Sequence, residues 1–137
     1  MGRLKGARPK QSERFADRDK VAVENTDLKP PIFSFEYLQK GYCVGDCSAE
    51  ERGGMLDRIR AISQQSWQQL RQTQRHGLGY EKIDRNAIKA AVPDFVTADV
   101  NLIAFRAIGK APMVGFRQGR VFNVLWVDRV FTLYDHG

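Results

Sequence analysis

The second half of the chain carries side chains that can move a proton or hold a phosphate, namely His76, Glu81, Arg106, Arg117, Tyr134 and His136. Cleavage of RNA without a metal ion needs a base that takes the 2′-hydroxyl proton, cations that stabilise the charge on the phosphoryl oxygens, and an acid that protonates the leaving 5′-oxygen. Imidazole, carboxylate, phenol and guanidinium groups meet all three needs. An unperturbed imidazole titrates near pH ~6.5, so it can serve as acid or as base.

Each of these residues also has an ordinary structural explanation. The two arginines could be solvated strand charges, paired with Asp99 or Asp128. His136 could belong to a mobile tail, and His76, next to a glycine, could be a cation at a helix end. Tyr134 could simply close the hydrophobic core. The residue types therefore define candidates and leave both explanations open.

The charge of the chain points to an anionic partner. The net charge is +6, and residues 1–29 carry 8 basic against 5 acidic side chains, so the remaining 14 against 11 leave an equal excess of +3 in the rest. The excess is therefore not confined to one tail, and nucleic acid is a reasonable partner for the folded part, although a basic surface can also serve solubility alone. The side chains we expect to bind RNA are Arg71, Arg75, Lys82 and Arg120. Arg71 and Arg75 could equally solvate one face of a helix.

The length and composition predict one soluble domain. The chain has 137 residues, 42% of them hydrophobic and 28% charged, as in an ordinary globular domain. No stretch approaches the roughly 18 uninterrupted apolar residues of a membrane span, and the basic N-terminus is not followed by an apolar run. We therefore expect a cytoplasmic protein that is neither secreted nor membrane-bound.

Several kinds of functional site have no counterpart in the sequence. Cys43 and Cys47 are too few for a disulfide framework and lack the second pair of a structural zinc site, so we interpret them as reduced thiols. There is no phosphate-binding glycine loop, nucleophile elbow or carboxylate cluster of a two-metal nuclease. We expect neither a metal ion nor a small-molecule cofactor.

The first half predicts a flexible basic arm over residues 1–31, followed by a domain over residues 32–137. The pair Pro30 and Pro31 ends the arm, and alternating aromatic residues favour a strand over residues 32–38. Ser48 begins a capping box and predicts a helix over residues 49–63, with Met55, Leu56, Ile59 and Ile62 along its buried side. Ser66 begins a second capping box and a shorter helix that ends near His76.

The second half predicts a strand, a short helix and an antiparallel meander. Residues 80–83 favour a short strand, and residues 85–92 favour one or two helical turns before Pro93. Residues 100–108, 113–117 and 121–127 are rich in β-formers and are separated by turn residues. In the last strand, alternation predicts Phe122, Val124 and Trp126 on one face, opposite Asn123 and Leu125. The fold class is therefore α+β, with an N-terminal strand and a helix pair packed on a twisted antiparallel C-terminal sheet.

Four segments near the end carry a resemblance to a known family, and these are residues 104–107 (AFRA), 114–117 (VGFR), 121–128 (VFNVLWVD) and 133–136 (LYDH). They resemble the end of toxins of the RelE/ParE superfamily, in which paired helices pack on a twisted antiparallel sheet. The resemblance covers residues 32–137 in topology and is concentrated after residue 100 in sequence. It implies a toxin of a type II toxin–antitoxin system, with a cognate antitoxin protein docked over the apolar surface of helices and sheet.

The resemblance also implies an activity and a site. RelE-like and YoeB-like members are metal-independent endoribonucleases that cut messenger RNA on the ribosome, with sheet arginines, basic loop residues and a C-terminal Tyr or His at the active surface. Arg106, Arg117, Tyr134 and His136 are the matching positions here. We assign transition-state stabilisation to the arginines and proton transfer to His136, with His76 or Glu81 in the complementary role. ParE-like members instead act on gyrase, so binding of a protein target, or non-catalytic RNA binding, stays open.

Overall fold

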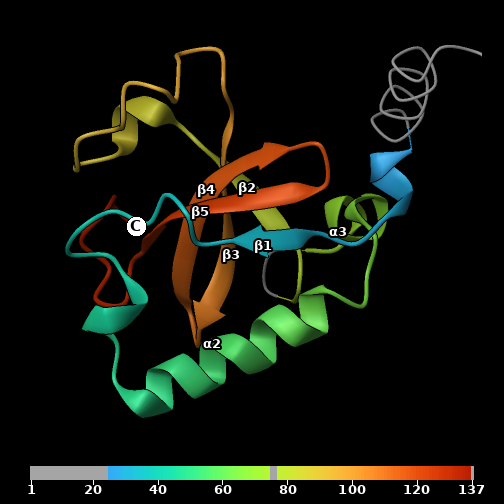
Figure 1. The fold of residues 1–137 in the computed structure, drawn as a ribbon, viewed down its shortest axis with the longest axis horizontal. Coiled ribbons are helices and arrows are strands. Elements are labelled where there is room, and N and C mark those ends of the chain that lie inside the picture. The colour runs from blue at the N-terminus through green and yellow to red at the C-terminus, as the bar shows by residue number, and fades with distance from the viewer. Residues whose placement is uncertain (1–24, 75–76, 137) are drawn as a thin grey trace, which may run out of the picture.

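A computed structural model describes residues 25–74 and 77–136 of the chain. The elements in chain order are η1 (Thr26–Leu28), β1 (Ile32–Ser34), η2 (Val44–Asp46), α2 (Ala49–Ile62), α3 (Trp67–Gln72), β2 (Tyr80–Ile83), η3 (Arg85–Ala87), β3 (Leu102–Ile108), β4 (Ala111–Gln118) and β5 (Val121–Val127). Two α-helices and a five-stranded mixed sheet make this an α+β fold (Figure 1). Within the described residues, no helix is both long and apolar enough to cross a membrane.

The two helices begin at the predicted capping boxes. The Ser48 hydroxyl accepts a hydrogen bond from the Glu51 amide at 3.1 Å, and the Glu51 carboxylate accepts one from the Ser48 amide at 2.8 Å. Ser66 and Gln69 make the same pair of bonds at the start of α3. These bonds satisfy amide groups that have no partner within a helix, which explains why the sequence located both starts.

The buried side of α2 is narrower than the sequence predicts. Met55 and Ile62 are buried and Ile59 packs against the same core, but the Leu56 residue is 66% exposed. Successive residues of a helix are about 100° apart around its axis, so Leu56 lies beside the Met55, Ile59 and Ile62 stripe rather than on it. The prediction that Leu56 is a core residue is wrong.

The sheet has the strand order β1-β5-β4-β3-β2. Strands β2 to β5 pair antiparallel, as the predicted meander requires, and β1 pairs with β5 in parallel. A parallel pair needs a long crossover between its two strands, and here α2 and α3 belong to that connection (Figure 1). The first strand thus forms one edge of the sheet and the short strand β2 forms the other.

Several predicted boundaries differ from the structure. The first strand is Ile32–Ser34 rather than residues 32–38, and only the single 3-10 turn Arg85–Ala87 forms where one or two helical turns were expected. Strand β4 begins at Ala111, so the predicted turn over residues 109–112 is shorter. Part of the predicted arm also contacts the folded unit, because the Lys29 carbonyl accepts a hydrogen bond from the Trp67 amide at 3.0 Å. The rest of the arm, residues 1–24, lies outside the described residues.

The sheet separates two hydrophobic cores. The core on the helix side includes Trp67 from α3 and the rings of Phe105 and Phe122, whose centroids lie 5.1 Å apart. The core on the other side is covered by irregular chain, since Val96 and Leu133 come from the segments after η3 and after β5. Helices therefore cover one face of the sheet and loops cover the other, and the loop-covered face carries the site described below.

A β-bulge in β5 changes the faces to which its side chains point. Val114 pairs with Trp126 and the next residue, Gly115, pairs with Val124, so Leu125 is an extra residue in the pairing. Phe122 and Val124 belong to the helix-side core as predicted, but Leu125 and Trp126 both belong to the other core. The predicted alternation is therefore wrong at Trp126, because an inserted residue reverses the alternation that follows it.

Candidate functional site

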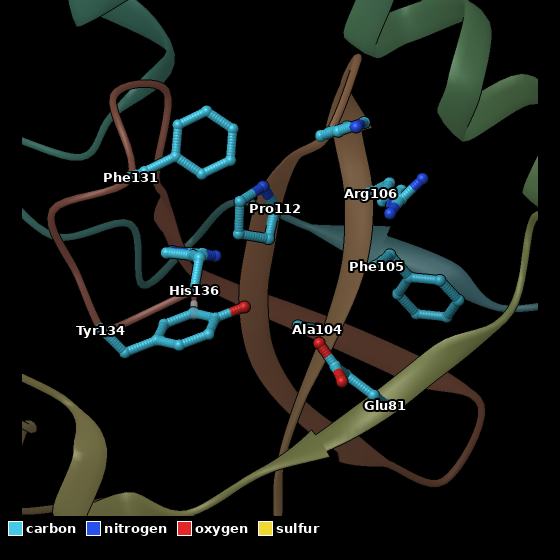
Figure 2. Close-up of a pocket in the computed structure, with 9 residues that line it drawn as sticks. Glu81, Ala104, Phe105, Arg106, Pro112, Phe131, Tyr134 and His136 are labelled. Atoms are coloured by element: carbon cyan, nitrogen blue, oxygen red, sulfur yellow. The ribbon is translucent and has the colours of Figure 1, made fainter. Parts of the chain in front are cut away.

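Four of the predicted site residues line one pocket on the loop-covered side of the sheet. The pocket has a volume of about 300 Å³ and is lined by Glu81, Ala104, Phe105, Arg106, Lys110, Pro112, Phe131, Tyr134 and His136. Glu81 comes from β2, Arg106 from β3, and Tyr134 and His136 from the segment after β5 (Figure 2). In Figure 2 the Tyr134 hydroxyl and the Glu81 carboxylate both point toward the space beside Ala104. The fold thus gathers an acid, a cation, a phenol and an imidazole from distant parts of the chain.

Strand pairing explains why Glu81 and Arg106 share this pocket. Glu81 pairs with Ala104 across β2 and β3, and directly paired residues point to the same face of a sheet. Arg106 lies two residues after Ala104 on the same strand, and residues two apart also share a face. Both side chains therefore leave their strands on the loop-covered face, where the chain after β5 adds its aromatic residues, although the Arg106 guanidinium points away from His136 (Figure 2).

The imidazole of His136 is held by a buried carboxylate. The Nε2 atom of His136 lies 3.1 Å from Oδ2 of Asp128, whose side chain is fully buried. Asp128 also accepts hydrogen bonds from the Thr132 amide at 2.8 Å and from the Leu133 amide at 3.1 Å. The segment after β5 thus wraps around the Asp128 carboxylate, and these bonds fix the position of the histidine ring.

Two aromatic rings enclose the same imidazole. The Tyr134 ring centroid lies 4.0 Å from that of His136, and the Phe131 ring meets the imidazole edge-on with centroids 4.9 Å apart (Figure 2). Phe131 has a φ of 61°, a left-handed conformation that costs a residue with a Cβ on the order of 1 to 3 kcal/mol. Such strain persists only where surrounding contacts impose it, and here the surrounding contacts are those that order the Asp128 to His136 segment.

The cationic side of the pocket is formed by Arg106 and Lys110. Burial lowers the pKa of Arg58 on α2, and the positive charge of Arg106 lowers that pKa further. The guanidinium groups of Arg58 and Arg106 therefore lie close enough to repel each other. The pocket lining therefore contains two cations, Arg106 and Lys110, and one acidic residue, Glu81.

Arg117 lies on the opposite face of the sheet. Its guanidinium donates hydrogen bonds to Asp27 at 2.7 Å, to Thr26 at 3.1 Å and to the Gly119 carbonyl at 2.7 Å. It also stacks over the Trp67 ring, 4.4 Å from the ring centroid. The structure therefore does not bring Arg117 to the pocket that contains Arg106, and these contacts fasten residues 26–27 to the domain.

The predicted RNA-binding residues do not form one surface with the pocket. Arg71 makes an ion pair with Asp27 at 2.6 Å, and Arg120 donates a hydrogen bond to the Pro30 carbonyl at 3.0 Å. Lys82 is exposed on β2 and lines two other hollows at the edge of the sheet. Arg75, and the predicted catalytic His76, lie outside the described residues.

Sequence reasoning missed three residues of the site. The sequence predicted Asp128 only as an ion-pair partner for a strand arginine, and it predicted no role in the site for Lys110 or Phe131. The detectable signal was an acidic residue directly after a strand and eight residues before a histidine, since such a short segment can fold back on itself. Asp99, the other carboxylate expected beside an arginine, instead accepts a hydrogen bond from the Thr97 hydroxyl.

Comparisons with known proteins do not assign the chain to a family. Comparison of the chain with protein-family models, with curated proteins and with solved structures gives no match in any of the three. Within residues 25–74 and 77–136, no group of three or more His, Cys, Asp or Glu side chains could hold a metal ion. The interpretation of the pocket therefore rests on its own residues.

Proposed function

We propose that the protein is a metal-independent endoribonuclease and that the pocket around His136 is its active site. The observation that carries this proposal is the His136 imidazole, held by the buried Asp128 in the same hollow as Glu81 and Arg106. A positioned imidazole, a carboxylate and a cation within one pocket are what cleavage of RNA without a metal ion requires.

In the proposed reaction, Glu81 takes the proton of the ribose 2′-hydroxyl and the 2′-oxygen attacks the adjacent phosphorus. The bond between phosphorus and the 5′-oxygen breaks as the new bond to the 2′-oxygen forms, and His136 in its protonated form donates a proton to the leaving 5′-oxygen. Arg106 and Lys110 stabilise the negative charge on the phosphoryl oxygens. The products are a 2′,3′-cyclic phosphate and a 5′-hydroxyl, and no step of this proposed reaction uses a metal ion or a cofactor.

The dimensions of the pocket suit a single nucleotide. A volume of about 300 Å³ is at the lower end of the range for ligand pockets, which extends from roughly 300 to 1,000 Å³. Phe131, with a 45% exposed residue surface, lies at the pocket and offers a ring against which a base can stack. We expect the scissile phosphate beside Arg106 and the neighbouring base against the Phe131 ring.

The wider role we propose is that of a cytoplasmic toxin of a type II toxin–antitoxin system, related to the RelE/ParE superfamily. The support is the order of elements, in which a first strand and a helix pair precede an antiparallel meander. Messenger RNA, free or on the ribosome, would be the substrate, and a cognate antitoxin protein would be the natural partner. ParE-like binding of a protein such as gyrase and non-catalytic RNA binding are the alternatives that the experiment below separates.

The experiment is an RNA cleavage assay with purified full-length protein, in the presence of EDTA and with or without ribosomes. We expect cleavage with cyclic phosphate ends, and we expect His136→Ala to lower the rate by about 10²- to 10⁴-fold. An RNA with a single 2′-deoxy nucleotide should resist cleavage at that position. Arg60→Ala is the matched control for Arg106→Ala, because Arg60 is exposed in the last turn of α2 and does not line the pocket.

Three outcomes would overturn the proposal. Full activity of a folded His136→Ala protein would place the chemistry elsewhere. Intact RNA together with growth arrest on induced expression would favour a protein target instead, and intact RNA without growth arrest would favour a non-catalytic RNA-binding module. Mapping transcript ends in the arrested cells distinguishes these cases in vivo.

A further inference from the structure

The Asp128 carboxylate is buried and hydrogen-bonded, unlike an acidic side chain at the surface. Its side chain is fully buried, and it accepts hydrogen bonds from the Thr132 amide at one oxygen and from the Leu133 amide at the other. A buried carboxylate is costly unless donors surround it, and here two backbone amides and one imidazole do so. The backbone bonds fix the plane of the carboxylate, and the remaining direction of Oδ2 is taken by Nε2 of His136.

We propose that Asp128 is a positioning residue that holds His136 in the tautomer protonated at Nε2. This inference rests on the proposed function, because it names the residue that prepares His136 for proton transfer. An ionised carboxylate can only accept hydrogen bonds, so the ring nitrogen that faces it must carry the proton. The other nitrogen, Nδ1, is then the atom that exchanges a proton with RNA.

The contacts of the His136 ring favour the orientation in which Nε2 faces Asp128. The Tyr134 and Phe131 rings, with centroids 4.0 Å and 4.9 Å from that of the imidazole, hold its plane, and a half-turn within that plane would put Cε1 in the place of Nε2 and lose the hydrogen bond to Asp128. In other enzymes, a buried aspartate that fixes the tautomer of a catalytic histidine contributes up to about 10⁴-fold to kcat. Burial, backbone anchoring and ring packing together are the features that such a role requires.

The other charged groups near His136 do not replace Asp128. Glu81, Arg106 and Lys110 line the same pocket from β2, β3 and the turn after β3. Asp135 is adjacent in sequence, but its side chain is 88% exposed and makes an ion pair with Lys89 at 2.6 Å. Asp128 is therefore the carboxylate that sets the tautomer, and Asp135 provides a matched control.

The first experiment measures the tautomer by the nitrogen-15 chemical shifts of the imidazole ring, without any substrate. The chain contains two histidines, so His76→Ala leaves one imidazole and assigns its signals. We expect the neutral ring of His136 to be protonated at Nε2 in the native protein and in Asp135→Asn. Asp128→Asn should yield a mixture of tautomers or the form protonated at Nδ1. A native ring protonated mainly at Nδ1, or an unchanged ring in Asp128→Asn, would overturn the proposal.

The second experiment is a double-mutant cycle on RNA cleavage and on stability. Asp128→Asn should lower kcat by about 10²-fold or more and leave KM within about twofold, because the aspartate acts through His136 and does not touch RNA. In a His136→Ala background the same substitution should cost no further rate, although it should still lower the melting temperature. Rate losses that multiply would show that Asp128 acts independently of His136. If the native protein cleaves no RNA, the proposed function fails and the tautomer measurement still decides the role of Asp128.

Discussion

Replacing Arg117 by alanine should destabilise the protein without affecting its chemistry. The guanidinium of Arg117 joins β4 to two other elements, since it bonds to Thr26 and Asp27 of η1 and stacks over Trp67 at the start of α3. Its side chain is 25% exposed, so water screens these contacts only in part. Truncation at the Cβ atom removes all of them and uncovers one face of the indole ring.

The contacts of Arg117 set the size of the effect. A cation over an aromatic ring contributes about 0.5 to 1 kcal/mol at an exposed site and up to about 2 kcal/mol when it is desolvated. The ion pair with Asp27 adds about 0.2 to 1 kcal/mol at most, because the Asp27 side chain is 43% exposed. Since these terms overlap, we expect a loss of about 1 to 2 kcal/mol, which corresponds to a decrease in melting temperature of roughly 3 to 10 °C in a domain of this size.

The assay compares thermal melting and RNA cleavage for Arg117→Ala and Arg106→Ala. Arg117→Ala should melt earlier and cleave RNA at the native rate when the assay temperature is well below the melting temperature. Arg106→Ala should show the reverse, a rate loss of about 10²-fold or more with a small change in melting temperature. Arg117→Lys, which keeps the charge and loses the planar guanidinium, should melt between the native protein and Arg117→Ala. A folded Arg117→Ala protein that loses as much activity as Arg106→Ala would refute the separation of the two arginines.

Three further predictions concern stability. Hydrogen bonds from Arg71 and Arg117 hold the pKa of Asp27 below its ordinary value of 3.8. The contribution of Asp27 to stability is therefore complete above that pH and is lost as the pH falls through the lower pKa of the folded state. Below about pH 4, the melting temperature of Asp27→Asn should fall less steeply with pH than that of the native protein. A Cβ atom added at Gly115 would lie 1.9 Å from the Asn123 carbonyl oxygen, so Gly115→Ala should cost at least about 3 kcal/mol in urea unfolding, whereas Gly53→Ala on α2, with nothing within 4 Å, should stabilise by about 0.5 to 1 kcal/mol. Ser48→Ala should cost about 1 kcal/mol in the same measurement, because it removes the cap of α2, and an unchanged midpoint would show that the cap contributes nothing.

Local signals in the sequence predicted much of the fold. Capping boxes located the starts of both helices, and β-rich segments located β2 at Tyr80–Ile83 and β5 at Val121–Val127 without error. Such signals depend on bonds between residues close in sequence or on the alternation of one strand, so a single segment contains them. The parallel pairing of β1 with β5 depends on contacts between distant segments and could not be read in the same way.

The candidate site was predicted in part, and strand register explains the rest. Glu81, Arg106, Tyr134 and His136 line one pocket, but Arg117 does not. Strands β3 and β4 pair so that even-numbered residues of both point to the loop-covered face as far as the irregularity after Arg106, as the pairs of Ala104 with Val114 and of Arg106 with Pro112 show. An odd-numbered residue of β4 therefore points to the helices. The register is set by the turn between the strands, and alternation within one strand does not reveal it.

The bulge at Leu125 also decides where the last described residues of the chain lie. With regular pairing to the end of β5, Trp126 would point toward α2 and α3, and Asp128 would emerge on that same side of the sheet. The extra residue, Leu125, moves Trp126 and Asp128 to the opposite face. The Leu125 carbonyl accepts a hydrogen bond from the Gln39 amide at 2.8 Å. Deleting Leu125 would therefore direct the chain that leads to His136 toward the helix-covered face of the sheet, although the sequence would still contain every residue that lines the pocket.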